Sequence, residues 1–417
     1  MISSISISAA PALIAARAQG GRVFVPGGPV EPISLAQAFD ESPRHGEGLT
    51  FCGMMIPGIN LRNWAVLHPT AQAEVFLPSP DLAETIASGK TKVLPLHYSA
   101  AYRYLQTMPF KVAIFHVCPP DAQGLCNLSL SADSSPAFLD RDIFKFGIIN
   151  HALPHIAGAP SVPFMIFDAW AETDQAPLPI APPSPSTESS AIAGHIAGLV
   201  EHGATLQTGI GRLPGAVMNA LTGHKNLKLH SGLIGDWALD LLAASAFAQK
   251  AGALTAGVIL GSKTLHDALK DDTRVSLVPI DQTHGFHKLA DIEKFTSINA
   301  ALEIDLLGQI NCEYVGGRTI SGVGGALDFL RGARASRGGK PIIMIQSQGK
   351  GGVSRIVPRL NTPTISIARS DAPILVTEYG AIDLEPLAID ARARAIISLS
   401  APSHRDDLER SWREMRK

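Results

Sequence analysis

Short apolar runs alternate with helical patterns along most of this chain, and this alternation restricts the fold more than any other feature. The run "GRVFVPGG" is typical of a strand, and the helical pattern "ISLAQAF" follows it; "AEVFL", "DLAETIAS" and "TKVLPLHY" repeat the cycle. Continuous apolar strands separated by helices are typical of parallel sheets that are covered on both faces. We therefore expect an α/β protein built on open, mostly parallel sheets.

The alternation stops near Thr173 and restarts at the helical pattern "AIAGHIAGLVEHG". The segment between them, "TDQAPLPIAPPSPSTESS", is rich in proline and serine, a composition that favours extended backbone. A chain of 417 residues is long enough for two or three domains. We predict an N-terminal lobe over residues 1–172, a linker over 173–190 and a C-terminal lobe over 191–417. The alternative is a single domain with a long surface loop at this place.

Charge and composition exclude several classes of protein. The net charge of −2 provides no broad basic surface for nucleic acid, and no uncharged apolar run is long enough to span a bilayer. The N-terminal stretch lacks the basic region of a signal peptide, and a strand-like "RVFVPGG" follows it, so we expect a short helix of the mature protein. The cysteines are far apart and show no zinc spacing, which indicates reduced thiols in a cytoplasmic protein: Cys52, Cys118, Cys126 and Cys312.

A metal site is not expected either. His151 and His155 have the spacing of metal ligands on a helix, but Pro154 lies between them and no third ligand is obvious. The segment "HVCPPDAQG" indicates a rigid turn after a strand, with Asp121 as its side-chain hydrogen-bonding group. No G-x-S-x-G elbow of the serine hydrolases is present.

Two glycine-rich segments each join a strand to a helix. Gly209 and Gly211 lie in "TGIGRLPGAV", and Gly322, Gly324 and Gly325 lie in "SGVGGALDFL". Glycines let backbone N–H groups approach a negatively charged or carbonyl oxygen at a helix N-terminus. Gly324 and Gly325 are therefore candidate donors of an oxyanion hole. Each segment is also consistent with a tight turn that serves the fold alone.

Two further segments contain candidate ligand-binding groups. In "SINAALEIDLLGQ" Asn299 precedes an expected strand, where its amide would add an oxyanion donor or simply cap the backbone. The same stretch alternates in a way that suits two strands joined by a turn at Gly308. In "QGKGGVSR" Lys350 and Gly351 belong to a basic, glycine-rich loop that would hold phosphates or a pantetheine arm, or would be a mobile surface loop.

Taken together and in this order, the motifs resemble the acetyl-CoA hydrolase/transferase family. The resemblance covers nearly the whole chain, and it is strongest in "LQTGIGRLPGAV", "SINAALEIDLLGQIN", "SGVGGALDFLRGA", "GGVSRIVP" and "VTEYGAIDL". It implies two open α/β/α lobes of the CoA-transferase type (NagB/RpiA-like), with the active-site cleft between them. It also implies an acyl-CoA and a small carboxylic acid as partners, and a homodimer or homotetramer. Coenzyme A would be substrate or product, and no covalently bound cofactor, nucleic acid or membrane is expected.

The resemblance also assigns roles to residues. In the family a glutamate in the motif H-S-E-M-x-x-D-G attacks the acyl-CoA and forms covalent intermediates. In "HSGLIGDW" His230, Ser231 and Asp236 match this motif, whereas Gly232 occupies the place of the glutamate and Trp237 replaces a glycine.

Other positions follow the family in part. Gly324 or Gly325 and Asn299 correspond to its oxyanion donors, and coenzyme A would contact five further residues: Gly209, Gly211, Gly322, Lys350 and Gly351. Ala326 replaces the usual glutamine, and "IQSQGK" replaces a turn with Pro and Ser. Glu303, Glu313 and Glu378 lie where the family commonly has acidic residues, which makes them poor candidates for a relocated nucleophile.

Three functions remain open, because losing a catalytic nucleophile typically costs on the order of 10⁴–10⁶ in rate. The first is hydrolysis by water, either of an acyl-CoA thioester or of the C–C bond of a β-keto acyl-CoA. His230, Asp236 or His284 would then be the base, although each is also readable as a structural hydrogen-bonding group. The second is CoA transfer with a substitute carboxylate or by direct exchange. The third is CoA binding without turnover.

Overall fold

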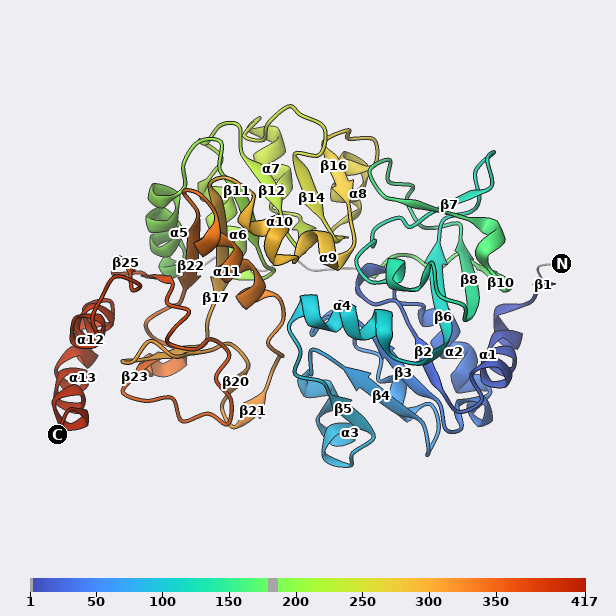
Figure 1. Ribbon diagram of the computed structural model, residues 1–417, viewed down its shortest axis with the longest axis horizontal. Coiled ribbons are helices and arrows are strands. Elements are labelled where there is room, and N and C mark those ends of the chain that lie inside the picture. The colour runs from blue at the N-terminus through green and yellow to red at the C-terminus, as the bar shows by residue number, and fades with distance from the viewer. Residues whose placement is uncertain (1–2, 179–186) are drawn as a thin grey trace. The chain divides into compact units, whose positions relative to one another are not determined.

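The computed structural model describes residues 3–178 and 187–417, and the chain divides into two compact units (Figure 1). Unit 1 comprises Met1–Ala181 and Leu254–Thr283, and unit 2 comprises Pro182–Ala253 and His284–Lys417. The predicted linker lies partly outside the described residues, because 179–186 are not among them. The lobe boundaries predicted from the sequence remain a proposal.

The helices of unit 1 are α1 (Ala10–Ala18), α2 (Ile33–Glu41), α3 (Ala83–Ala87), α4 (Tyr98–Thr107), α8 (Lys263–Leu269) and α9 (Ile280–Thr283). Its short 3₁₀ helices are η1 (Ile7–Ala9), η2 (Gly28–Val30), η3 (Pro43–Gly46), η4 (Trp64–Val66), η5 (Pro80–Leu82), η6 (Ser135–Phe138) and η7 (Phe164–Ile166). Its strands are β1 (Ser3–Ser4), β2 (Arg22–Phe24), β3 (Thr50–Gly53), β4 (Gln72–Val75), β5 (Thr91–Val93), β6 (Phe110–Val117), β7 (Leu125–Asn127), β8 (Phe144–Asn150), β9 (Ser161–Pro163), β10 (Ala169–Thr173), β14 (Leu254–Ala256), β15 (Val258–Leu260) and β16 (Val275–Leu277).

The helices of unit 2 are α5 (Thr187–Leu199), α6 (Arg212–Ala220), α7 (Ala238–Ala243), α10 (Phe286–Ala290), α11 (Ala326–Ala335), α12 (Ile389–Ser398), α13 (Pro402–Met415) and the 3₁₀ helix η8 (Lys350–Gly352). Its strands are β11 (Thr205–Thr208), β12 (Lys228–His230), β13 (Leu233–Gly235), β17 (Phe295–Ala300), β18 (Glu303–Asp305), β19 (Ile310–Asn311), β20 (Tyr314–Val315), β21 (Arg318–Thr319), β22 (Lys340–Met344), β23 (Ile356–Val357), β24 (Ile374–Thr377) and β25 (Gly380–Asp383).

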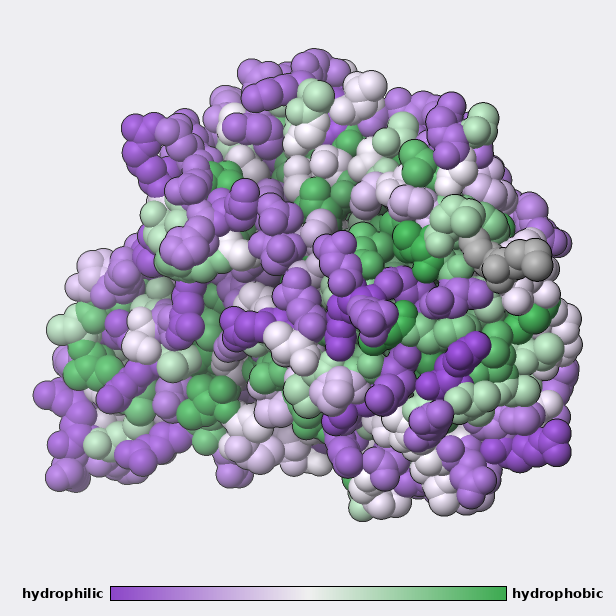
Figure 2. All heavy atoms as spheres, turned by 45° about the vertical axis from the view of Figure 1, so that its right-hand side comes forward, coloured by the Kyte–Doolittle hydropathy of each residue, from purple (hydrophilic) through white to green (hydrophobic). Residues whose placement is uncertain are grey.

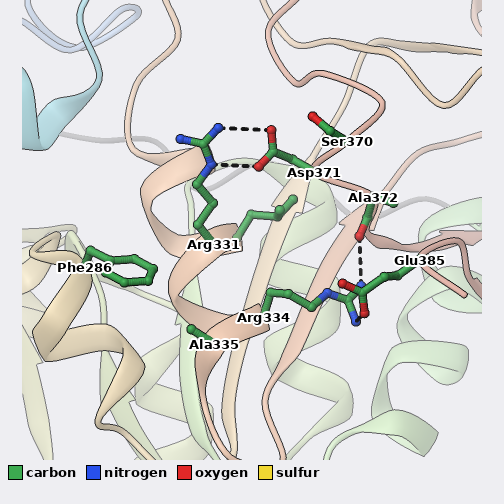
Figure 3. Close-up of a pocket in the computed structure, with 9 residues that line it drawn as sticks. Phe286, Arg331, Arg334, Ala335, Ser370, Asp371, Ala372 and Glu385 are labelled. Carbon is green, nitrogen blue, oxygen red and sulfur yellow. Dashed lines mark hydrogen bonds and ion pairs between the residues drawn. The ribbon is translucent and has the colours of Figure 1, made fainter.

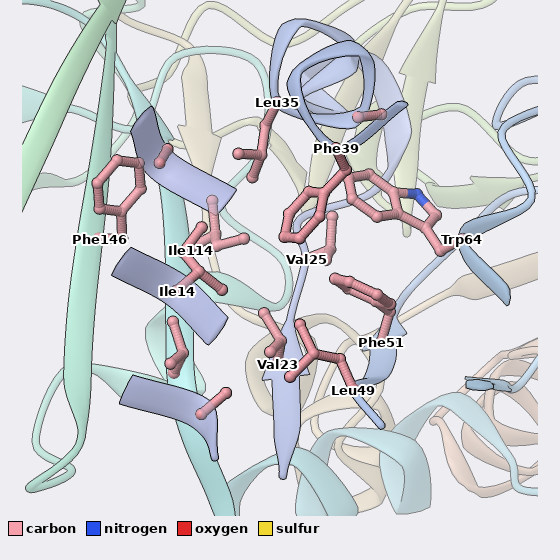
Figure 4. Packing of buried hydrophobic residues seen from close by; sticks show 14 of the residues in the cluster. Ile14, Val23, Val25, Leu35, Phe39, Leu49, Phe51, Trp64, Ile114 and Phe146 are labelled. Carbon is pink, nitrogen blue, oxygen red and sulfur yellow. The ribbon is translucent and has the colours of Figure 1, made fainter. Parts of the chain in front are cut away.

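Unit 1 is built on an eight-stranded sheet with the strand order β1-β10-β8-β6-β2-β3-β4-β5, in which all neighbouring pairs are parallel. One face packs against α1 and α2, where Phe39 lies among Val25, Phe51 and Trp64 (Figure 4). Phe24 lies between Val23 and Val25 in sequence, so its side chain points to the opposite face of the sheet. There its ring packs against that of Phe138 in η6, with ring centroids 4.3 Å apart. Because strand side chains alternate between faces, both faces are covered, as predicted.

The later segment of unit 1, residues 254–283, is tied to the rest of that unit by its backbone. The N–H of Leu277 in β16 donates to the carbonyl of Gly158. The N–H of Ala132 donates to the carbonyl of Gly257, and the N–H of Ile280 donates to the carbonyl of Asp133. A segment that is distant in the sequence therefore completes unit 1.

A buried histidine in β6 makes the stability of unit 1 sensitive to acid. Asn150 donates from Nδ2 to His116 Nε2 at 2.9 Å, which leaves Nδ1–H to donate to the carbonyl of Val30 at 2.8 Å. Both ring nitrogens thus have partners that suit the neutral imidazole. Burial lowers the pKa of His116 to about 4, from an ordinary value of 6.5.

We expect this group to destabilise the fold as the pH falls from 6.5 towards 4. In that range the imidazole of the unfolded chain binds a proton, whereas the buried imidazole of the folded chain stays neutral. The contribution of His116 to the free energy of unfolding is therefore complete above pH 6.5 and decreases below it. Between pH 7 and pH 5 the loss is about 2 kcal/mol. Urea unfolding of the wild type and of His116→Gln at pH 7 and at pH 5 measures this loss of stability. An equal loss in the two proteins would rule out His116 as the cause.

Unit 2 contains the sheet order β12-β11-β17-β22-β24-β25, in which β25 is antiparallel to β24 and the other neighbours are parallel. Helix α11 packs on β17 and β22, and α5 packs against α6 (Figure 1). The predicted turn at Gly308 is confirmed, because β18 and β19 are antiparallel and Gly308 has a φ of 88°. The N-terminal helix is also confirmed, as α1.

The surface of the molecule is mixed in polarity. On the face shown in Figure 2, hydrophilic residues are interspersed with hydrophobic ones. Among residues 3–178 and 187–417, no helix is both long and apolar enough to cross a membrane.

Candidate active site

The carboxyl ends of β11, β12, β17 and β22 lie at one edge of the unit 2 sheet, because these strands are parallel. Ligands of open α/β sheets bind at such an edge. Gly209 and Gly211 follow β11 and lead into α6, Gly232 follows β12, and Asn299 lies near the end of β17. Gly211 has a φ of 113°, a conformation that favours glycine at the N-cap of α6. The topology therefore gathers several of the predicted residues at one edge.

Asn299 lies inside β17, and not in a loop as the sequence pattern suggested, although the strand expected after it is present as β18. The prediction was wrong because β11 and β22 pair with β17 on both sides, and Asn299 is in register with Ile343 of β22. Such long-range pairing overrides the local preference of asparagine for turns. The Asn299 side chain is half-buried at the sheet edge.

A glutamine that the sequence analysis missed holds the Asn299 amide in place. Asn299 donates from Nδ2 to Gln207 Oε1 at 2.9 Å, and Gln207 donates from Nε2 to Asn299 Oδ1 at 3.2 Å. Gln207 is buried in β11. An amide nitrogen has two hydrogens, and Gln207 uses one of those on Asn299. The signal was a polar residue inside the apolar strand "ATLQTGIG".

His230 shares its face of the sheet with Gln207. Leu206 of β11 is in register with Leu229 of β12, so the next residues of the two strands, Gln207 and His230, also point to one side. The His230 ring meets Phe295 edge-on, with centroids 6.3 Å apart. Ser231 is buried and donates from Oγ to the carbonyl of Thr208 at 2.9 Å, which fixes the register directly before Gly232.

The space beside Gly232 is occupied by an imidazole. A β-carbon on residue 232 would lie 3.3 Å from Cε1 and 3.6 Å from Nε2 of His284. Gly232 is not among the described residues with positive φ, so its backbone conformation does not demand glycine. His284 therefore lies where a glutamate side chain at position 232 would begin.

The same imidazole packs against the glycine-rich loop that precedes α11. Gly325 is the N-cap of α11, and Gly324 before it has a φ of 55°, so the predicted loop-to-helix turn is confirmed. A β-carbon on Gly325 would lie 2.4 Å from His284 Nε2 and 2.5 Å from Cδ2. Only glycine allows this approach. Phe329, one turn into α11, packs on the ring with centroids 4.3 Å apart.

His284 is consequently enclosed and uncharged. Its side chain is 3 % exposed. Burial, with a smaller contribution from the nearby His230, lowers the pKa of His284 to about 3. A neutral imidazole with one acceptor nitrogen therefore lies between Gly232 and Gly325 near neutral pH.

Other predicted residues lie on neighbouring turns. Asp236 follows β13 and is half-buried, and its carbonyl accepts from the N–H of Leu239. The indole of Trp237 packs against the last residue of β13, since a β-carbon on Gly235 would lie 2.7 Å from its Nε1. Gly322 is half-buried in the loop before α11.

The basic loop after β22 is a closed turn. Lys350 and Gly351 belong to η8, Lys350 is exposed, and Gly351 has a φ of 73°. Gln348 donates from Nε2 to the carbonyl of Gly352 at 3.2 Å. The Lys350 ammonium therefore faces solvent, where it can meet an anionic ligand.

The glutamates that were considered as relocated nucleophiles are held by hydrogen bonds. Ser347 donates to Glu378 from its N–H at 2.9 Å and from Oγ at 2.5 Å. Ser366 donates to Glu313 at 2.6 Å, and Asn311 donates to Glu303 at 3.1 Å. Asp121 likewise accepts from two backbone N–H groups in its turn, as predicted.

A pocket of about 260 Å³ lies elsewhere in unit 2 (Figure 3). Its arginines are paired: Arg331 with Asp371 at 2.7 Å, and Arg334 with Glu385 at 2.9 Å. The α11 residues that line it begin five residues after Gly325 and are Leu330, Arg331, Arg334 and Ala335. At a rise of about 1.5 Å per residue this pocket is roughly 8–15 Å along the helix from the His284 site.

Comparisons with known proteins agree with the fold. Residues 261–412 match the family model described as the acetyl-CoA hydrolase/transferase C-terminal domain. The chain is 34 % identical to 4-hydroxybutyrate coenzyme A transferase of Clostridium kluyveri, over 92 % of this chain and 92 % of that protein. The crystal structure of RipA from Yersinia pestis superposes with a TM-score of 0.90 at 26 % identity, over 99 % of this chain and 97 % of that one. For 4-hydroxybutyrate CoA-transferase from Porphyromonas gingivalis the TM-score is 0.80 at 26 % identity, over 99 % and 98 %.

Proposed function

Because the chain belongs to the acetyl-CoA hydrolase/transferase family, we propose that it cleaves an acyl-CoA and that water, rather than an enzyme carboxylate, is the nucleophile. The description of the family itself covers both hydrolysis and transfer. The substrate is a CoA thioester, and the products of thioester hydrolysis are free coenzyme A and a carboxylic acid. If the acyl group is a β-keto acid, the water attacks the keto carbon and a shortened acyl-CoA results.

One observation carries this proposal. Gly232 follows the end of β12 by two residues, at the position where the family motif has its glutamate, and the His284 ring fills the adjoining space. A glycine provides neither a nucleophile nor a base. The glutamates that match other acidic positions of the family are engaged in hydrogen bonds within unit 2. A covalent glutamyl intermediate therefore has no residue to form on at this strand end.

We expect the predicted oxyanion donors to serve attack by water as well. The N–H groups at the start of α11, near Gly325, and the amide of Asn299 are suited to hold the carbonyl oxygen as it gains charge. A donor of this type is worth roughly 2.7–4 kcal/mol in known enzymes. Gly209, Gly211, Gly322, Lys350 and Gly351 are the residues we expect to contact coenzyme A.

CoA transfer is the second candidate function. The relative from Clostridium kluyveri is named as a transferase, and its match covers 92 % of this chain. In this case a small carboxylic acid accepts the CoA directly. Transfer without the glutamate would need both substrates in the site at once.

Product analysis separates the two functions. The protein is incubated with a panel of acyl-CoAs, with and without acetate, and free CoA and new thioesters are followed by mass spectrometry. Hydrolysis predicts free CoA at a rate independent of acetate, or a shortened acyl-CoA if the C–C bond is cleaved. New thioesters that form only with acetate, and no free CoA, would replace our proposal with transfer.

Breaking the Gln207–Asn299 hydrogen bonds should lower the rate of catalysis in a protein that is still folded. Gln207→Leu removes both hydrogen bonds that orient the Asn299 amide, so kcat should fall about tenfold or more while KM changes little. Steady-state kinetics with the best acyl-CoA of the panel measures this. Gln249→Leu, which removes only a bond to the carbonyl of Phe247, is the control. A fall in kcat of the same size in both variants would refute the positioning role.

A further inference from the structure

We propose that His284 is a catalytic residue that binds the attacking water and removes its proton. The inference rests on the proposed hydrolysis and adds the identity of the base. It starts from the position of one imidazole between two glycines that come from different parts of unit 2.

The His284 ring lies where a base that activates water would be needed. Its Cε1 and Nε2 face Gly232, and its Nε2 and Cδ2 face Gly325, so Nε2 is the polar atom that is common to both contacts. Gly232 marks the place of the missing nucleophile, and Gly325 marks the start of the oxyanion loop. A water bound at Nε2 would therefore be close to the carbonyl carbon of an acyl group whose oxygen lies at that loop.

The ring is also held rigidly, as a catalytic base must be. Phe329 covers it at a centroid distance of 4.3 Å, and the close approach of Gly325 leaves no room for another rotamer on that side. The side chain is nearly inaccessible, at 3 % exposure. Fixed groups in enclosed sites lose little free energy to reorganisation during the reaction.

The charge state suits a base in the resting enzyme. Burial and the neighbouring His230 lower the pKa of His284 to about 3, so the ring is unprotonated and keeps an acceptor lone pair throughout the physiological range. Such a ring becomes more basic when negative charge develops beside it, because an opposite charge within a few ångströms favours the imidazolium. The oxyanion near Gly325 provides this charge in the transition state.

The step balances without any further reactant. The water oxygen forms a bond to the carbonyl carbon, the carbonyl π electrons move to its oxygen, and one proton passes from water to His284 Nε2. When the oxyanion collapses, the C–S bond breaks and its electron pair stays on sulfur. The proton on His284 then passes to the thiolate, so that an acyl-CoA and water become a carboxylic acid and coenzyme A.

His230 and Asp236 are less suited to this role. His230 is the last residue of β12 and packs edge-on against Phe295, two residues before Gly232. Asp236 lies beyond β13, further along the chain from the strand end. The His284 ring, by contrast, faces both Gly232 and Gly325.

The test compares His284→Gln with His287→Gln, which changes an exposed histidine on the adjoining α10. We expect His284→Gln to lower kcat for hydrolysis by 10²–10⁴-fold with KM nearly unchanged, and His287→Gln to leave both within about twofold. Circular dichroism and Tm establish that the variants are folded. A folded His284→Gln protein that hydrolyses within fivefold of the wild type would overturn the inference.

A second variant separates chemistry from packing. His284→Ala leaves a space that a small ring can enter, and added imidazole should restore at least a tenth of the lost rate. Pyrrole has the same shape but no basic nitrogen, and it should restore nothing. Equal effects of imidazole and pyrrole, or no rescue, would mean that His284 only supports the fold. A wild type that forms no free CoA or shortened acyl-CoA would instead overturn the proposed hydrolysis itself.

Discussion

The variant Gly325→Ala is expected to lose at least about 100-fold in acyl-CoA turnover. Its new methyl group would lie 2.4 Å from His284 Nε2 and 2.5 Å from Cδ2, with Phe329 at 3.3 Å on the other side. Either the imidazole or the start of α11 must then move by about an ångström. A displacement of that size in a catalytic constellation typically costs 10²-fold in rate.

The matched control is Gly198→Ala, since Gly198 lies in α5 and no atom is within 4 Å of a β-carbon there. This control should keep full activity, with stability equal or higher by up to about 1 kcal/mol because alanine favours helix. Steady-state kinetics and thermal unfolding of both variants test the prediction. A Gly325→Ala enzyme with wild-type kcat would show that the contact between His284 and the oxyanion loop has no catalytic importance.

Restoring the glutamate at position 232 is expected to change the reaction only when space is provided for it. In Gly232→Glu the β-carbon would lie 3.3 Å from His284 Cε1, so the carboxylate is deflected and little covalent chemistry should appear. In the double variant Gly232→Glu/His284→Ala the obstructing ring is absent. We expect acetate-dependent thioester exchange there at least 100-fold faster than in the single variant, as a nucleophile is regained.

This comparison has a built-in control. His284→Ala alone has the space but no carboxylate, and it should show no exchange. The exchange rates of the three variants are measured with labelled acetate and followed by mass spectrometry. Efficient exchange in Gly232→Glu alone would show that His284 does not restrict the nucleophile position.

Local patterns in the sequence were sufficient to predict much of the fold. The apolar run of β6 identifies a buried parallel strand, because such strands are covered on both faces. The turns at Gly308 and Asp121, and the glycines before α11, were predicted because turn chemistry depends on a few adjacent residues.

The candidate site was predictable only in part. The glycine at position 232 is visible in the sequence, but the position of His284 beside it depends on the path of the chain between β12 and α10. Asn299 was expected in a loop, because its pairing partners in β11 and β22 are remote in sequence. Gln207 and Phe329 were missed for the same reason, since their roles arise from contacts across strands and helices.

The most direct test of the central claim is the intact mass of the protein during turnover. The wild type is mixed with excess acyl-CoA, quenched in acid within the first turnovers, and measured by mass spectrometry, with the double variant Gly232→Glu/His284→Ala as a positive control. Attack by water predicts that the mass of the wild type stays unchanged while free CoA or a shortened acyl-CoA accumulates. A fraction of protein heavier by one CoA, removed by hydroxylamine and located at a glutamate, would contradict it.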